Sequence, residues 1–147
     1  GICQTILFKK NQFSGLQIMG IYKHTRIALY IRDNFSCVYC DLTDKSAKNL
    51  TLDHVKARKN GGSNSYKNLA TCCRHCNTTK KDLSLNGWFV VLQQRFINAE
   101  RIQEIKKKLE KNSKMLPCQM RALRNQAKGI QPWCKLDKGH SLQQQRG

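Results

Sequence analysis

Residues 37–81 read CVYCDLTDKSAKNLTLDHVKARKNGGSNSYKNLATCCRHCNTTKK, and this stretch decides the fold. It contains two pairs of cysteines separated by two residues: Cys37 with Cys40 at its start, and Cys73 with Cys76 near its end. Two such pairs can bind one Zn²⁺ tetrahedrally, with Zn–S bonds of ~2.3 Å. Because thiolates would fill all four positions, the site has no place for a water molecule, and we expect its metal to be structural rather than catalytic.

Cys72 offers an alternative ligand, because it could pair with Cys76 across three intervening residues. We expect Cys73 to be the ligand, since it gives the second pair the same spacing as the first. The other cysteines, Cys3, Cys118 and Cys134, have no partner at metal-binding spacing and are expected to be free.

The segment between the cysteine pairs predicts secondary structure of its own. Residues 49–55 alternate apolar and polar side chains, as a strand does. Gly61 and Gly62 allow a tight reversal, after which residues 66–70 should return toward the strand. Residues 73–83 are typical of a short helix, and residues 24–33 predict another helix upstream. The order indicates a ββα unit that zinc holds together at its base.

These motifs in this order resemble the HNH endonuclease family with its ββα-metal fold. The resemblance rests on C-x-x-C, L-x-L-D-H-V, G-G, N-L and C-x-x-C-N-x-x-K, and covers about residues 31–83, including the approach RDNFSC at residues 32–37. The expected fold is therefore a small α+β domain. It has a ββα-metal core stapled by a four-cysteine zinc site, with flanking helices and a basic C-terminal helical extension.

The resemblance also implies roles for four residues. His54 would be the general base that activates water, a task that suits imidazole because its ordinary pKa lies near ~6.5. Asn68 would hold the imidazole in orientation through its amide or main chain. Asp53 and Asn77 would ligate a catalytic divalent cation. Asn77 stands where many members have histidine, and oxygen ligands alone favour Mg²⁺ or Mn²⁺ over a second zinc ion.

The implied reaction is hydrolysis of DNA with a single divalent metal, leaving 5′-phosphate and 3′-hydroxyl ends. We expect contacts with nucleic acid from four basic residues around this site: Lys56, Arg58, Lys80 and Lys81. One unit of this kind cuts one strand, so a double-strand break would require a homodimer or two successive events.

The bulk composition agrees with a nucleic-acid partner. The 147 residues include 27 Lys and Arg against 9 Asp and Glu, a net charge of +18, and such a surface attracts polyanions, with duplex DNA as the expected partner. The mean hydropathy of −0.61 indicates a thin core that needs a metal staple. With neither a leading apolar segment nor a run long enough to span a bilayer, we expect no membrane association and a reducing cytoplasm.

The expected domain boundaries divide the chain into four parts. Residues 1–23 would form short strands, 24–83 the HNH domain, 84–128 a basic helical extension, and 129–147 a disordered tail. The extension carries apolar residues at helical spacing between Trp88 and Lys111, which predicts one long helix or two joined near Asn98. We expect this apolar face to pack on the ββα unit. The alternatives are a dimer seam or a DNA-tracking helix that uses Lys106, Lys107, Lys108 and Lys111.

Two other functions fit parts of the pattern. A non-catalytic zinc module could bind nucleic acid without cleaving it, and a zinc-ribbon adaptor could bind other proteins. The simultaneous presence of Asp53, His54, Asn68 and Asn77 favours the enzyme.

Overall fold

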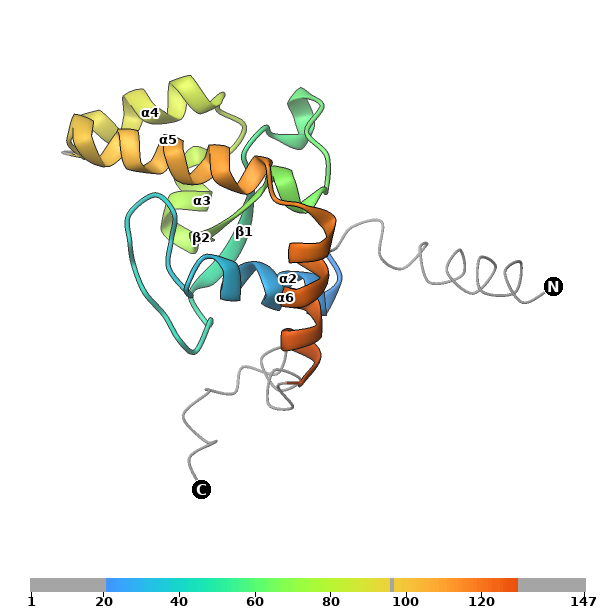
Figure 1. Ribbon diagram of the computed structural model, residues 1–147. Helices are drawn as coiled ribbons and strands as arrows, with labels where there is room; N and C mark the ends of the chain where they lie inside the picture. Colours follow the sequence, from blue (N-terminus) through green and yellow to red (C-terminus); the bar gives the residue numbers. More distant parts are fainter. Residues whose placement is uncertain (1–20, 96, 130–147) are drawn as a thin grey trace.

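An antiparallel β-hairpin lies at the centre of the computed structural model, which describes residues 21–95 and 97–129 (Figure 1). Strand β1 (Leu50–His54) pairs with strand β2 (Leu69–Cys73), so that Leu50 lies opposite Cys73 and His54 lies opposite Leu69. The predicted strand and its return are therefore confirmed. The hairpin places the end of β1 that carries Asp53 and His54 beside the start of β2.

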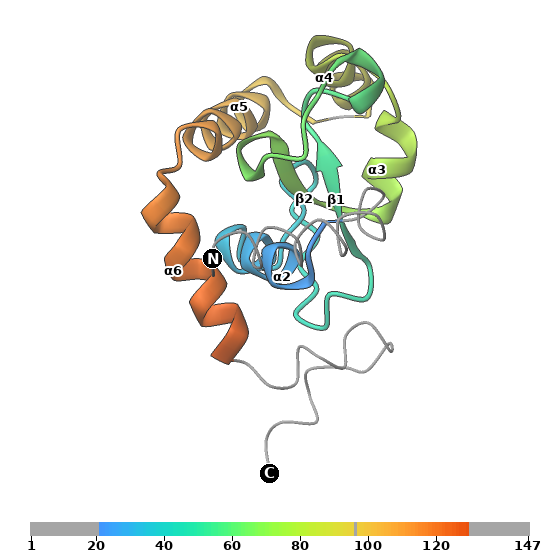
Figure 2. The same ribbon diagram turned by 90° about the vertical axis from the view of Figure 1, so that its right-hand side faces the viewer.

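Helices and short 3₁₀ turns surround the hairpin. In chain order they are α2 (Lys23–Arg32), η1 (Arg58–Asn60), η2 (Tyr66–Asn68), α3 (Arg74–Lys80), α4 (Leu85–Gln94), α5 (Ala99–Ser113) and α6 (Pro117–Gly129). Helix α3 lies on one side of the hairpin, and α2 and α6 lie on the other (Figure 2). The expected small α+β fold is thus confirmed. The expected strands before residue 21 and the expected tail after residue 129 fall outside the described residues.

Helix α3 begins directly where β2 ends. Cys73 is its N-cap residue, and the Cys73 sulfur accepts a hydrogen bond from the backbone N–H of Cys76 at 3.3 Å. A capping sulfur at this position satisfies one of the N–H groups that the first helical turn leaves without a partner. The same residue therefore ends a strand, starts a helix and stands ready as a metal ligand.

The apolar residues of the C-terminal extension pack against the cysteine knuckle, the turn of residues 37–40 that carries the first cysteine pair. The Trp88 ring of α4 meets Tyr39 edge-on, with centroids 5.5 Å apart and planes at 82°. Helix α5 adds Ile102, Ile105 and Leu109 to the same buried cluster. The expected packing on the ββα unit is confirmed. The apolar series forms two helices, because Asn98 caps α5 by accepting a hydrogen bond from the Arg101 N–H at 2.8 Å.

Helix α2 packs along α6 and covers a second core cluster, with Leu50, Leu52 and Leu69 from the strands (Figure 2). Helix α2 begins after Tyr22, which forms no side-chain capping hydrogen bond. Thr25 lies inside the helix, where its hydroxyl oxygen accepts a hydrogen bond from Arg124 of α6 at 3.1 Å.

The end of α2 is fixed by a buried carboxylate. Asp33 is fully buried and accepts hydrogen bonds from the Arg32 guanidinium at 2.8 and 3.0 Å, from the Thr71 N–H at 3.0 Å and from the Asn112 amide at 3.3 Å. A buried charge is stable only when it is paired and hydrogen-bonded, and Asp33 is both. It therefore ties α2, β2 and α5 into one unit.

On the surface of α5, Glu104 forms an ion pair with Arg101 at 3.0 Å. Over residues 21–95 and 97–129, the helices are all too short or too polar to cross a bilayer.

Candidate functional site

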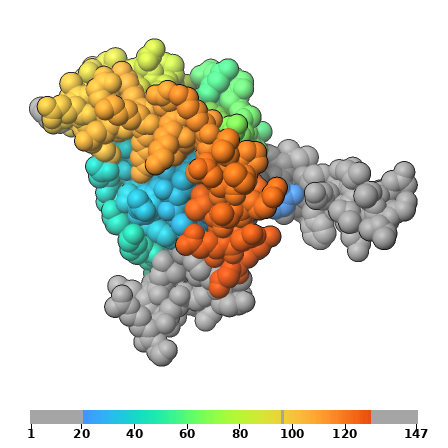
Figure 3. All heavy atoms as spheres, viewed as in Figure 1, coloured from blue at the N-terminus to red at the C-terminus, as the bar shows by residue number. Residues whose placement is uncertain are grey.

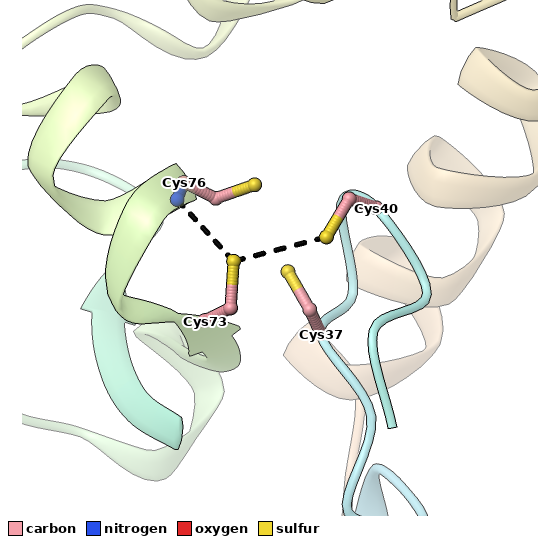
Figure 4. A group of neighbouring side chains, drawn as sticks. All are labelled: Cys37, Cys40, Cys73 and Cys76. Carbon is pink, nitrogen blue, oxygen red and sulfur yellow. Dashed lines mark hydrogen bonds between the residues drawn. The ribbon is translucent and has the colours of Figure 1, made fainter. Parts of the chain in front are cut away.

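Four cysteine sulfurs converge where the knuckle meets the start of α3 (Figure 4). The sulfurs of Cys37, Cys40, Cys73 and Cys76 all lie within 4.8 Å of one another, and those of Cys40 and Cys73 are 3.7 Å apart. A tetrahedral Zn²⁺ with Zn–S bonds of ~2.3 Å would separate its sulfurs by about 3.8 Å. The geometry and the soft donor set therefore fit a metal ion such as zinc.

The prediction of Cys73 over Cys72 is confirmed. Cys72 forms a hydrogen bond with Cys37, but its sulfur is not one of the four that cluster together. Cys72 is fully buried, and its thiol donates a hydrogen bond to the carbonyl oxygen of Cys73 at 3.1 Å. Cys73 is the residue whose sulfur joins the cluster.

The clustered thiols perturb one another's ionisation. The hydrogen bond with Cys37 raises the pKa of Cys40 to about 11, whereas hydrogen bonds with Cys40, Cys72 and Cys76 lower the pKa of Cys37. The cluster thus favours one thiolate and disfavours further ones, since like charges repel at this distance. A divalent cation would offset that repulsion, and its affinity should rise with pH as the thiols lose their protons.

His54 is the last residue of β1 and is half-buried at the end of the hairpin where the loop of residues 55–68 leaves the strand. Its Nε2 atom lies 2.8 Å from the Oδ1 atom of Asn64. Asn64 is a site residue that the sequence analysis missed. It follows the Gly-Gly pair in a loop where asparagine suggests only a turn, so nothing in the sequence marks it as a partner of the imidazole.

Asn68 holds the loop rather than the imidazole. Its Oδ1 atom accepts from the Lys56 N–H at 2.9 Å, and its Nδ2 donates to the carbonyl oxygens of Lys56 at 3.1 Å and Ser63 at 2.9 Å. Its own carbonyl accepts from the Val55 N–H at 2.9 Å, which extends the hairpin by one bond. The expected contact through the amide is therefore corrected. Asn68 fixes the backbone on both sides of the loop that carries Asn64.

Two glycines give this loop its shape. Gly61 has φ of +85°, a conformation that side chains disfavour. A Cβ atom at Gly62 would lie 1.7 Å from the carbonyl oxygen of Lys56, so only glycine lets the chain approach itself this closely. The tight reversal that the sequence predicts is confirmed.

Asp53 points into the interior and is engaged on both carboxylate oxygens. The Tyr39 hydroxyl donates to Oδ2 at 2.6 Å, and the Lys80 ammonium lies 3.2 Å from Oδ1 and 3.1 Å from Oδ2. Burial raises the pKa of Asp53, although the Lys80 charge and the Tyr39 hydrogen bond act in the opposite direction. Burial and the Asp53 charge raise the pKa of Tyr39 well above its usual value, so its hydroxyl stays protonated and donates.

The prediction that Lys80 contacts nucleic acid is wrong. Lys80 is fully buried, and besides its ion pair it donates to the carbonyl oxygen of His54 at 2.9 Å. Lys80 therefore neutralises Asp53 and fixes the end of β1 from α3. The other expected nucleic-acid contacts, Lys56, Arg58 and Lys81, are exposed, and their role stays a prediction.

Asn77 lies on α3, one turn before Lys80, and is half-buried. Residues three apart share a helix face, so Asn77 is on the face that α3 turns toward β1. The carboxylate of Asp53 and the amide oxygen of Asn77 are donors suited to a hard divalent cation. Their chemistry would suit such a cation, and the Lys80 ammonium already lies against both oxygens of the Asp53 carboxylate.

His75 lies between the second pair of cysteines but is not one of the clustered residues. It is exposed, and its Nε2 atom is 2.8 Å from Nη1 of Arg95.

Lys80→Met should destabilise the protein strongly. It would leave Asp53 as a buried charge without its cation, and we expect the free energy of unfolding at pH 7 to fall by about 3–5 kcal/mol. Lys81→Met alters the exposed neighbouring residue and should change the free energy of unfolding by less than about 0.5 kcal/mol. Urea denaturation followed by circular dichroism measures both.

The loss of unfolding free energy caused by Lys80→Met should become smaller as the pH falls. Burial already raises the pKa of Asp53, and removing the ammonium raises it further, so the folded variant takes up a proton at a pH where the unfolded chain does not. A protonated Asp53 needs no cation. If Lys80→Met were as stable as Lys81→Met at pH 7, this result would contradict the structural role of the ion pair between Lys80 and Asp53.

The comparison with protein families agrees with this geometry. The model of the HNH endonuclease family matches residues 37–83, a range that includes the thiol cluster, the hairpin and α3. No curated protein matches the chain. The match indicates nuclease activity in general and makes DNA a plausible partner. Residues 37–83 of this chain thus match the HNH endonuclease family, as the order of their motifs predicts.

Proposed function

We propose that the protein is a metal-dependent DNA endonuclease that hydrolyses phosphodiester bonds and leaves 5′-phosphate and 3′-hydroxyl ends. One observation carries the proposal. His54 stands half-exposed at the loop end of the hairpin, while Asp53 beside it turns toward α3, the helix that carries Asn77. A base and two oxygen donors are thus held on adjoining elements within the segment that matches the HNH family.

His54 would act as the general base. It accepts a proton from a water molecule, which then attacks the phosphorus atom from the side opposite the leaving 3′ oxygen. Asn64 orients the imidazole through the 2.8 Å contact with Nε2, which leaves Nδ1 for the water. The backbone beneath the ring is fixed from two sides, by Lys80 at the His54 carbonyl and by Asn68 at Val55. Such preorganisation keeps the base within reach of its proton.

Asp53 and Asn77 would hold the catalytic Mg²⁺ or Mn²⁺. When bound, the cation would offset the negative charge that builds up on the phosphate and the leaving oxygen. The four-cysteine site would hold Zn²⁺ and serve the fold alone.

Exposed basic residues near this site would hold the DNA backbone. Asn60 of η1 donates to the carbonyl oxygen of Asp82 at 3.1 Å, so the loop that carries Lys56 and Arg58 is joined to the segment that carries Lys81. Their charges can thus meet neighbouring phosphates along one edge of the site. A reducing cytoplasm, where the thiols stay available as ligands, is part of the same proposal.

One observation favours a non-catalytic nucleic-acid-binding module as the second candidate. Both oxygens of Asp53 lie next to the Lys80 ammonium, which could stand permanently in place of the cation. The two candidates differ in whether a divalent cation can share the carboxylate with Lys80.

Incubation of zinc-loaded protein with supercoiled plasmid separates them. The endonuclease should convert the plasmid to the nicked form when Mg²⁺ or Mn²⁺ is added and leave it intact in buffer without an added divalent cation. Polynucleotide kinase should label the new 5′ ends only after phosphatase treatment, because they carry phosphate. If the protein binds the plasmid but does not nick it with either metal, the non-catalytic nucleic-acid-binding module is the correct function and the endonuclease is excluded.

A further inference from the structure

A groove of about 1130 Å³ lies outside the candidate active site, where the end of α2 meets α5 and α6. Figure 3 shows α2 in blue at the bottom of the angle between the orange helices α5 and α6. The residues that line the groove do not include the candidate catalytic residues, the cysteine cluster or η1. The site already described therefore does not account for it.

The wall of this groove is positively charged. Helix α5 contributes Lys107, Lys108, Lys111 and the adjoining Lys114, and the residues that line the groove include no Asp or Glu. Lys114 pairs with Glu110 at 2.6 Å. Within the described ranges, Lys107 and Lys111 have no acidic partner. They are four residues apart, so they share a helix face about 6 Å apart along the axis, a spacing that lets them meet neighbouring phosphates of one strand.

Apolar side chains also line the groove. They are Ile31, Met115, Leu116, Ala122 and Leu123, and Leu116 is 58% exposed although it is a large apolar residue. The amides of Gln119 and Gln126 also line the groove and can form hydrogen bonds with a ligand. A duplex keeps its base faces stacked inside and offers little to these apolar side chains. An unpaired strand presents phosphates and apolar base faces together.

Other occupants match this chemistry less well. A second copy of the chain would bring a net charge of +18 toward the same lysines. The segments outside the described residues, 1–20 and 130–147, each contain more basic than acidic residues. Neither would neutralise the wall of the groove, and a polyanion would.

We propose that this groove binds an unpaired segment of DNA. The inference rests on the proposed function for the choice of DNA, and it extends that function to substrates that carry a single-stranded stretch, such as nicked, flapped or branched duplexes. The groove is tied to the cleavage site, because the Tyr66 hydroxyl of η2 donates to the Met115 carbonyl at 3.3 Å and η2 ends at Asn68. A strand in the groove would thus be held at a fixed position relative to the loop beside His54.

The test is binding of a fluorescein-labelled 20-mer of oligothymidine, measured by anisotropy with zinc-loaded protein and no added Mg²⁺ or Mn²⁺, so that cleavage does not interfere. The double variant Lys107→Gln/Lys111→Gln removes two cations of the groove. Arg121→Gln/Lys128→Gln is the matched control, because it removes two exposed cations of α6 that do not line the groove.

We expect the groove variant to bind the oligonucleotide at least about fivefold more weakly at low salt. Its plot of log affinity against log salt should be shallower by about 1.4, the slope expected for two lost phosphate contacts on a single strand. The control should lose less than about twofold. Leu116→Gln should weaken binding of the 20-mer more than binding of the same sequence as a duplex.

Three results would overturn the proposal: equal losses in the two double variants, a duplex that competes as well as the single strand, or tighter binding of oligouridine than of oligothymidine. Sedimentation that shows a dimer dispersed by the groove variant would assign the groove to a second copy instead. Because the assay measures binding alone, its outcome is independent of whether the protein nicks plasmid.

Discussion

Cys73→Ser is expected to remove the bound zinc and unfold the domain, whereas Cys72→Ser keeps both the metal and the fold. Cys73 supplies one of the four sulfurs within 4.8 Å of one another, whereas Cys72 is not among them. Structural zinc contributes about 10–16 kcal/mol of apparent binding energy, more than the net stability of about 5–15 kcal/mol of a typical domain. Without the metal, the small core around the knuckle is insufficient.

The measurement is zinc content by mass spectrometry together with a thermal melt followed by circular dichroism. The wild-type protein and Cys72→Ser should contain one zinc per chain and melt cooperatively, and addition of a strong chelator should abolish the transition in both. Cys73→Ser should contain almost no zinc and show no cooperative melt. The ligand assignment would be wrong if Cys72→Ser lost the metal and Cys73→Ser retained it.

His54→Ala is expected to slow plasmid nicking by about 10²–10⁴-fold, the usual contribution of a general base. His54 is half-buried at the end of a strand and is held by the exposed Asn64, so its removal should leave zinc content, thermal stability and DNA affinity unchanged. The loss should therefore appear in the rate at saturating protein rather than in binding.

His75→Ala is the matched control for this prediction. His75 is also a histidine at the surface of the HNH segment, but its ring contacts Arg95 rather than the hairpin. We expect its nicking rate to stay within about twofold of wild type. The nicking rate of Asn64→Ala should lie between those of His54→Ala and His75→Ala, because this substitution removes the contact that orients the imidazole but keeps the imidazole itself. Unchanged nicking by His54→Ala would exclude His54 as the base.

The sequence predicts the metal site and the ββα unit because their signals are local. Two matched cysteine spacings, an alternating strand and a Gly-Gly reversal each depend on neighbouring residues. The extension is harder to predict, since apolar periodicity alone fits one long helix or two. The side-chain cap at Asn98 ends that ambiguity, and it becomes visible only when the Asn98 side chain is seen to accept from Arg101.

The contacts that organise the candidate site could not be predicted, because they join residues far apart in the chain. Lys80 looks like a solvated charge in the sequence, since burial of an ammonium is unfavourable without a partner. Its partner Asp53 lies 27 residues away, and only the packing of α3 on β1 brings them together. The same holds for Tyr39, whose hydroxyl meets Asp53 across 14 residues.

The position of Tyr39 links the cysteine cluster to the Asp53 carboxylate. Tyr39 lies between the two cysteines of the first knuckle, and it is the residue whose hydroxyl donates to the Asp53 carboxylate. Binding of a metal ion by the four cysteines, which fixes the turn that carries Tyr39, would therefore also position the Asp53 carboxylate. A chain with no ion at the four sulfurs is therefore expected to lose the position of the Asp53 carboxylate together with its fold.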